Sequence, residues 1–210
     1  MTYPFSEEFR RELADRCAAF PRLPPGESTR SLKPAAVAIT LVEAQDASGA
    51  AAILLTRRAA RLRAHRNQWA LPGGRCDDGE TLAAAALREL DEEIGLNVAE
   101  DAVLGLLDDY PSRSGYLITP VVVWAGPGRE ISPNPDEVAS VHRITLDEIT
   151  RPNVVDFISI PESDRQVVRL HIARSIIHAP TAAVVYQFGE LVAGRITRVA
   201  ELEQPVFAWK

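Results

Sequence analysis

The sequence predicts an α/β protein in which helices cover a mixed sheet. Hydrophobic patterns typical of strands and of helices interleave along the chain, and no internal repeat or low-complexity linker separates them. The 210 residues, 46% of them hydrophobic, are enough to bury one good core. We therefore predict a single domain at residues 33–210, preceded by a helix and a proline-rich loop at residues 1–32.

The first twenty residues carry apolar side chains at helical spacing, and we interpret them as a packing helix without a catalytic role. These side chains are Phe5, Phe9, Leu13, Cys17 and Phe20. The segment that follows, PRLPPGESTR, contains three prolines and a glycine and is predicted to be a loop.

Short runs rich in β-branched and aliphatic residues predict the strands. They lie at residues 35–42, 52–56, 103–107, 116–124 and 139–144. Towards the C-terminus we predict an extended segment at residues 167–172, then a final helix that carries Pro180 in its first turn and ends near Leu191.

Residues 73–95 predict a tight loop followed by a helix. Gly73, Gly74 and the Asp-Asp-Gly run at residues 77–79 are turn formers. The alanine-rich run from Thr81 has high helix propensity, and Gly95 is a natural helix C-cap. The sequence therefore places a glycine-rich loop directly before a helix.

Three carboxylates on one side of that helix predict a metal site. At about 100° per residue, Glu89, Glu92 and Glu93 share one side, where they repel one another unless a cation lies among them. Carboxylate and carbonyl oxygens are suited to hard cations, so Mg²⁺ or Mn²⁺ is the expected cofactor. The alternative is a solvated acidic face, which explains neither the spacing to Gly74 and Glu80 nor the arginine within the acidic group.

Residues 74–96 follow the pattern G-x5-E-x7-R-E-U-x-E-E-x-G-U, where U is aliphatic, and thereby resemble the Nudix hydrolase family. The resemblance implies a Nudix α/β/α sandwich and a metal-dependent diphosphate hydrolase. It also implies that Glu89 and Glu93 are the core metal ligands, with Glu92 beside them and the carbonyl of Gly74 completing the shell. Arg88 would act in the catalytic machinery, holding the loop against the helix by an ion pair with Glu80.

The general base is open between two carboxylates. Glu137 lies in a polar loop before a strand, where several relatives supply an extra acidic ligand or base. Glu92 is the competing candidate within the helix.

Residues 54–74 resemble the signature of coenzyme A pyrophosphatases within the family, although Asn67 and Leu71 stand where that signature has glycine and phenylalanine. The arginine-rich run in this segment predicts a phosphate-binding group, because guanidinium binds phosphate through paired hydrogen bonds. The expected substrate-binding residues are Arg57, Arg58, Arg63 and His65. The expected substrate is coenzyme A or acyl-coenzyme A, and the alternative substrate is ADP-ribose or another nucleoside-diphosphate compound. For the arginines, the alternative is a solvated surface segment without a binding role.

Composition excludes several other functions. A net charge of −6 and a pI near 5.3 argue against nonspecific nucleic-acid binding, so the expected partner is a small nucleotide-like molecule. Two cysteines form no disulfide framework, no apolar run approaches membrane-spanning length, and we expect a cytoplasmic protein. A homodimer is left open. A catalytically silent nucleotide-binding domain is the alternative of a different class, but such domains usually lose box carboxylates.

Overall fold

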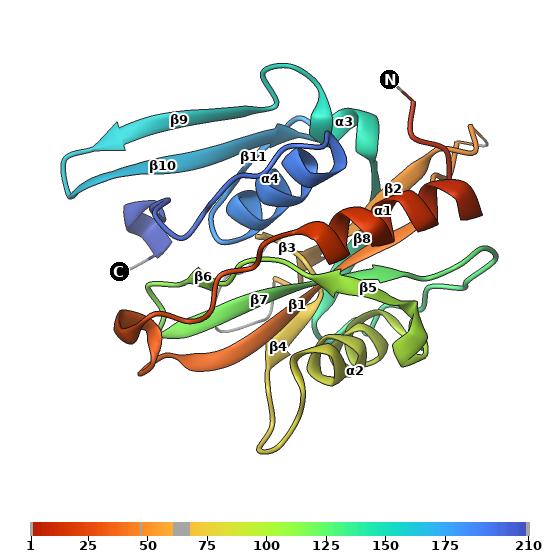
Figure 1. Cartoon of the computed structure of the whole chain (residues 1–210), viewed down its shortest axis with the longest axis horizontal. Coiled ribbons are helices and arrows are strands. Elements are labelled where there is room, and N and C mark those ends of the chain that lie inside the picture. Colours follow the sequence, from red (N-terminus) through yellow and green to blue (C-terminus); the bar gives the residue numbers. More distant parts are fainter. Residues whose placement is uncertain (1, 47, 61–67, 209–210) are drawn as a thin grey trace.

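The computed structural model describes residues 2–46, 48–60 and 68–208 (Figure 1). The large sheet is mixed, as predicted: β1 and β7 run parallel, and its other pairs are antiparallel. The main path is β3-β2-β1-β7-β5, with β4 on β1, β6 on β7 and β8 on β2. These strands are β1 (Lys33–Glu43), β2 (Ala51–Arg58), β3 (Trp69–Ala70), β4 (Gly73–Arg75), β5 (Val103–Leu106), β6 (Tyr110–Pro111), β7 (Tyr116–Trp124) and β8 (Val138–Thr145).

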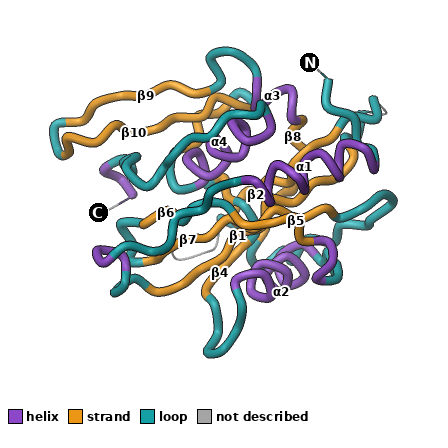
Figure 2. Tube along the Cα trace, in the orientation of Figure 1, coloured by secondary structure: helices purple, strands orange, loops and turns teal. Residues whose placement is uncertain are grey.

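Helices cover both faces of this sheet (Figure 2). On one face, α2 (Leu82–Ile94) packs on the even-numbered residues of β1, such as Ala36 and Ala38. On the other face, α1 (Glu7–Ala19) and α4 (Thr181–Val192) pack on the odd-numbered residues, such as Ile39 and Leu41. Period-two alternation along each strand therefore supplies two separate cores, and the α/β fold is confirmed.

The predicted N-terminal helix is present as α1. Ser6 caps it by accepting a hydrogen bond from the Phe9 amide at 3.2 Å. Phe9, Leu13 and Cys17 are buried in the same hydrophobic cluster as α4, so α1 belongs to the core.

A second, antiparallel sheet lies beyond α4 (Figure 1). It contains β9 (Val155–Ile160), β10 (Ser163–Ile172) and β11 (Ser175–His178), of which the sequence predicted only part of β10. The short helix α3 (Leu146–Thr150) and the 3-10 segments Glu27–Thr29, Glu100–Ala102 and Val206–Ala208 complete the fold. Among the described residues, no helix is long and apolar enough to cross a membrane.

Pro180 occupies a different position from the predicted one. It precedes α4 as the N-cap residue, after a cis peptide bond with Ala179, and the helix begins at Thr181.

Candidate active site and substrate cavity

The boundaries of α2 place its carboxylates as predicted. The Thr81 hydroxyl accepts a hydrogen bond from the Ala84 amide at 3.1 Å and caps the N-terminus. Gly95 ends the helix in the left-handed conformation, with φ of 66°, and its amide donates to the Asp91 carbonyl at 2.8 Å. Glu89, Glu92 and Glu93 thus follow one another on a well-capped helix.

Arg88 ties the glycine-rich loop to α2. Its guanidinium donates to both carboxylate oxygens of Glu80, at 3.0 and 3.2 Å, and to the Arg75 carbonyl at 2.9 Å. The predicted Arg88–Glu80 ion pair is therefore confirmed, and it lowers the pKa of Glu80. The same guanidinium lies 3.0 Å from an oxygen of Glu89 and 3.0 Å from an oxygen of Glu92.

Glu93 is the most buried carboxylate of the helix, with 4% of its surface exposed. Burial raises its pKa to about 8, and the negative charges of Glu89 and Glu137 add to the effect, against the Arg58 charge and the Gly73 amide. Burial also raises the pKa of Glu89. The hydrogen bond that Glu89 accepts from Arg88 lowers this pKa but does not cancel the effect of burial. Among the described residues, the positive charges beside these carboxylates therefore do not offset the cost of burying them.

Gly74 provides the close backbone approach that the cluster requires. A Cβ atom added there would lie 2.1 Å from the nearest oxygen of Glu89, so any other residue would displace the Glu89 carboxylate. In the described residues, no three Asp, Glu, His or Cys side chains already surround a common point as ion ligands would. The donor set nevertheless fits a hard divalent cation, because the carboxylate of Glu89 is half-buried and that of Glu93 is buried beside the backbone of β4.

Glu137 reaches this region through the end of α2. The Ser132 and Asn134 amides donate to the carbonyls of Ile94 and Glu93, at 2.8 and 2.9 Å, and satisfy two carbonyls that a helix end leaves free. The loop then returns to β8 past the half-buried Glu137. Its charge raises the pKa of both Glu89 and Glu93, which puts this residue within electrostatic range of the predicted ligands.

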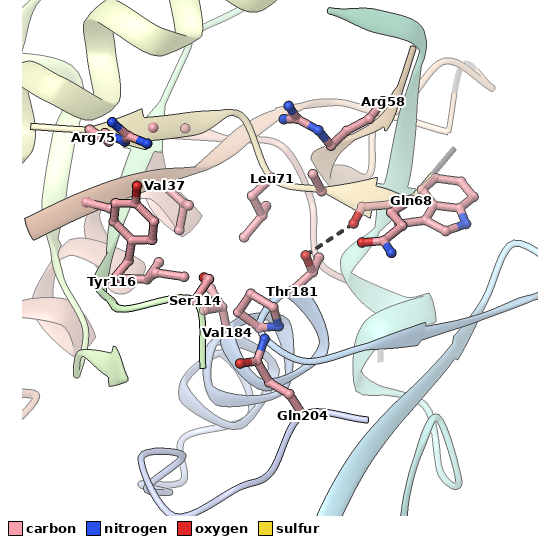
Figure 3. Close-up of a pocket in the computed structure, with 17 residues that line it drawn as sticks. Val37, Arg58, Gln68, Leu71, Arg75, Ser114, Tyr116, Thr181, Val184 and Gln204 are labelled. Carbon is pink, nitrogen blue, oxygen red and sulfur yellow. Dashed lines mark hydrogen bonds between the residues drawn. The ribbon is translucent and has the colours of Figure 1, made fainter. Parts of the chain in front are cut away.

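A cavity of about 500 Å³ lies on the opposite face of the sheet, beneath α4 (Figure 3). Its floor is made by β1 and β7, its rim by β3 and β4, and its far wall by the start of α4 and the C-terminal segment. Val37, Leu71 and Val184 lie around its centre, while Arg58 and Arg75 lie on the β4 side (Figure 3). Ile118 of β7 also lines it.

The predicted substrate-binding residues have different locations. Arg58 lines the cavity. Arg57 instead lies over the Trp69 ring, with its guanidinium carbon 5.0 Å from the ring centroid. Arg63 and His65 fall outside the described residues. The β2–β8 pairing shifts register between Arg57 and Arg58, so these two neighbours do not follow simple strand alternation.

Several cavity residues were not predicted as site residues. Ser114, Thr181 and Gln204 line the cavity, although none of them was among the expected substrate-binding residues. Thr181 is held there by a hydrogen bond from its hydroxyl to the Trp69 carbonyl at 3.3 Å (Figure 3). Only the packing of α4 and the C-terminal segment against the sheet brings these residues together.

Comparison with known proteins places residues 32–166 within a family model described as NUDIX domain. A Nudix hydrolase of Photorhabdus laumondii, named NudL and described as uncharacterized, is 34% identical over 143 residues, which cover 67% of this chain and 76% of the relative. Nudix hydrolase 3 of Caenorhabditis elegans is 33% identical over 150 residues, covering 69% of this chain and 60% of that protein.

Two solved structures share the fold at low identity. A MutT/nudix family protein from Enterococcus faecalis aligns with a TM-score of 0.54 at 19% identity, covering 90% of this chain and 75% of that one. The M. smegmatis Nudix hydrolase RenU aligns with a TM-score of 0.51 at 22% identity, covering 79% and 88%.

Proposed function

Because the chain belongs to the Nudix hydrolase family, we propose that it is a metal-dependent diphosphate hydrolase whose substrate is coenzyme A or an acyl-coenzyme A. The products would be 3',5'-ADP and a 4'-phosphopantetheine. Nudix hydrolases generally use divalent metals, and we propose Mg²⁺ or Mn²⁺ here. We expect a cytoplasmic enzyme, and a homodimer is compatible with the proposal.

One observation carries this proposal: buried carboxylates of α2 meet the backbone of Gly74, and the described residues place too little positive charge beside them to offset their burial. Glu93 is 4% exposed, and its pKa is raised to about 8. The Glu89 carboxylate occupies the space that a side chain at position 74 would need. Such an arrangement is costly unless a cation neutralises it, which supports Glu89, Glu93, Glu92 and the Gly74 carbonyl as ligands.

The bound metal would neutralise the diphosphate and lower the pKa of an attacking water. The chain's own residues position the reactants. Arg88 holds the loop at Arg75 and Glu80 against α2, so the Gly74 carbonyl keeps its place beside Glu89. Glu137 and Glu92 remain the two candidates for the base that takes the proton from the water.

Of these two candidates we prefer Glu137. Arg88 already binds the Glu92 carboxylate at 3.0 Å, and that side chain is 57% exposed. Glu137 is half-buried and influences the pKa of both predicted core ligands. A base would need to lie close to the attacking water, and the charge of Glu137 acts on Glu89 and Glu93, the two residues that would hold the metal.

Arg58 supports a phosphate-containing substrate, since it lines the cavity and acts electrostatically on Glu93. ADP-ribose, or another nucleoside diphosphate linked to a small group, is the second candidate within the class. A catalytically silent nucleotide-binding domain is disfavoured because the box carboxylates are all present.

The test is a substrate panel with purified protein. Coenzyme A, dephospho-coenzyme A, ADP-ribose, dinucleoside polyphosphates and NADH are each incubated with Mg²⁺ or Mn²⁺, and the products are separated by chromatography. We expect metal-dependent cleavage, fastest for coenzyme A. ADP-ribose cleaved at least tenfold faster than coenzyme A would reverse the order of the two candidates, and no cleavage of any compound would favour the silent domain.

A further inference from the structure

The cavity and the carboxylate cluster meet at one residue. Gly74 lines the cavity on one face of the sheet, and Glu89 lies against it from the α2 face. Arg58 and Arg75 lie along the same rim of the cavity (Figure 3). A diphosphate positioned beside Gly74 therefore has these two arginines near it, and one of its two substituents points towards the cavity.

The interior of the cavity is suited to a neutral group. Among its described lining residues there is no Asp, Glu, Lys or His, and the two arginines are confined to the β4 side. Val37, Leu71 and Ile118 provide an aliphatic centre, where burial of methyl and methylene groups is favourable. Hydroxyl and amide side chains, Thr181 and Gln204 among them, lie on the side of α4 and the C-terminal segment (Figure 3).

Two lining residues carry buried hydrogen-bond donors that the chain leaves unused. Arg58 Nε and Trp69 Nε1 are buried, and neither has a hydrogen-bond partner in the part of the chain that the structure describes. A buried donor without a partner is unfavourable, so polar pairing at this edge of the cavity is incomplete within the described residues.

The aromatic residues of the cavity are a poor platform for a nucleobase. Tyr116 has the Arg75 guanidinium over its ring, 5.2 Å from the centroid, and Trp69 has Arg57 over its ring at 5.0 Å. Each ring is thus already paired with a cation from the chain itself. Tyr110, the other tyrosine near this strand, is 1% exposed and donates to the Leu202 carbonyl, so it is part of the core.

We infer that this cavity binds the neutral arm of the substrate, a branched aliphatic chain with amide groups, and that the nucleoside lies outside it. This inference rests on the proposed function, and it assigns the selection between coenzyme A and ADP-ribose to the cavity. Part of the wall, Thr181, Val184 and Gln204, comes from beyond residues 32–166, the segment that the family model matches. The C-terminal region therefore contributes one wall of the cavity that would select the substrate.

The C-terminal wall is held in place by a buried ion pair. Glu203 accepts hydrogen bonds from the Arg113 guanidinium and from the Ser163 hydroxyl, the latter at 2.8 Å. The Gln204 side-chain carbonyl accepts from the Arg113 amide at 2.5 Å. The position of Gln204 at the cavity is thus fixed by its neighbours.

A matched pair of substrates and a matched pair of variants test the inference. Dephospho-coenzyme A and ADP-ribose share adenosine diphosphate and differ in the other substituent. Ile118→Trp fills the cavity from its floor, while Leu117→Trp places the same bulk at the neighbouring position of β7, which does not line the cavity. Thermal unfolding checks that each variant folds, and Val37→Phe replaces Ile118→Trp if that variant does not.

We expect Ile118→Trp to lower kcat/KM for dephospho-coenzyme A at least tenfold and that for ADP-ribose less than threefold. Leu117→Trp should change both less than threefold. Equal losses on the two substrates, or equal effects of the two variants, would overturn the inference, because either result would mean that the cavity does not distinguish the neutral arm.

Binding without turnover separates this inference from the proposed function. Calorimetry on the metal-free protein measures the affinities of 4'-phosphopantetheine and AMP. We expect Ile118→Trp to weaken 4'-phosphopantetheine at least tenfold and leave AMP unchanged. Absence of 4'-phosphopantetheine binding to the wild type, or a tenfold loss of AMP affinity in the variant, would reject the cavity assignment. If wild type binds as expected yet cleaves no coenzyme A compound, the proposed function fails and the cavity assignment stands.

Discussion

The pKa values of two buried carboxylates in this protein, Glu93 and Glu203, are shifted in opposite directions. Glu203 is 1% exposed and accepts hydrogen bonds from Arg113, Ser163 and the Gln204 amide, and its pKa is lowered to about 2. Glu93 is 4% exposed, has neighbouring carboxylates, and its pKa is raised to about 8. Burial alone does not decide the charge state; the cations that the chain supplies do.

The contrast distinguishes a carboxylate that stabilises the fold from one that is suited to bind a ligand. At Glu203 the chain provides its own cation, and the pair anchors the C-terminal segment to the loop after β6. At Glu93 the positive charge is insufficient, which supports an external cation. Asp108 and Asp109 resemble Glu203: Arg198 pairs with the first and Arg22 with the second, so the C-terminal and proline-rich segments are also fastened by ion pairs.

The largest effect is expected at the metal site. Glu93→Gln keeps the shape but removes a ligand charge, so turnover should fall by about a hundredfold or more, equivalent to roughly 2.7 kcal/mol. Without metal, the variant should unfold at about the same temperature as wild type near pH 7, because the raised pKa of about 8 already keeps the buried Glu93 carboxyl mostly neutral. Steady-state rates and thermal unfolding measure the two effects.

Asp91→Asn is the control for this change, because Asp91 is exposed on α2 and its carboxylate accepts a hydrogen bond from the Asn97 side chain at 3.2 Å. Its rate should stay within twofold of wild type. A near-normal rate for Glu93→Gln at saturating Mg²⁺ would remove Glu93 from the ligand set.

The second effect is on stability rather than chemistry. Glu203→Gln leaves Arg113 without its anion and should lower the free energy of unfolding by about 2 to 3 kcal/mol. Glu201→Gln, which removes an 86% exposed partner of Arg165, should cost less than about 0.5 kcal/mol. Urea denaturation measures the free energy of unfolding of both variants. Similar losses would show that Glu203 does not anchor the C-terminal segment.

Acid should abolish this stabilisation gradually. A carboxylate whose pKa is lowered on folding stabilises the native state fully above its unfolded pKa of about 4.5, and the stabilisation disappears as the pH falls towards about 2. The stability gap between wild type and Glu203→Gln should therefore be constant from pH 7 to 5.5 and shrink below pH 4.5. A gap that persists unchanged at pH 3 would mean that it does not come from ionised Glu203.

The smallest effect distinguishes the two adjacent arginines. Arg58→Ala should lower kcat/KM for coenzyme A about tenfold, or roughly 1.4 kcal/mol, because it removes a donor from the cavity rim. Arg57→Ala should lower it less than threefold, since that side chain stacks on Trp69. Comparing coenzyme A with dephospho-coenzyme A in both variants shows whether either arginine binds the 3'-phosphate. Equal losses in the two variants would contradict the assignment of Arg58, rather than Arg57, to the cavity rim.

By itself the sequence determined the parts of the molecule whose geometry is local. The glycine loop, the limits of α2 and the Arg88–Glu80 pair follow from turn formers, caps and helical spacing, because neighbours on one helix are placed by 3.6 residues per turn. The mixed sheet and most of its strands also follow from short-range patterns.

Tertiary structure decided the rest. The residues that build the cavity come from β1, β3, β4, β7, α4 and the C-terminal segment, and the Arg113–Glu203 pair joins positions 90 residues apart. The second sheet was predicted only in part, since β9 and β11 are short, half-buried strands that depend on β10 and α4 for their packing. Such contacts form only when the whole core assembles, because many weak, distant interactions must be satisfied together before any one of them is favourable.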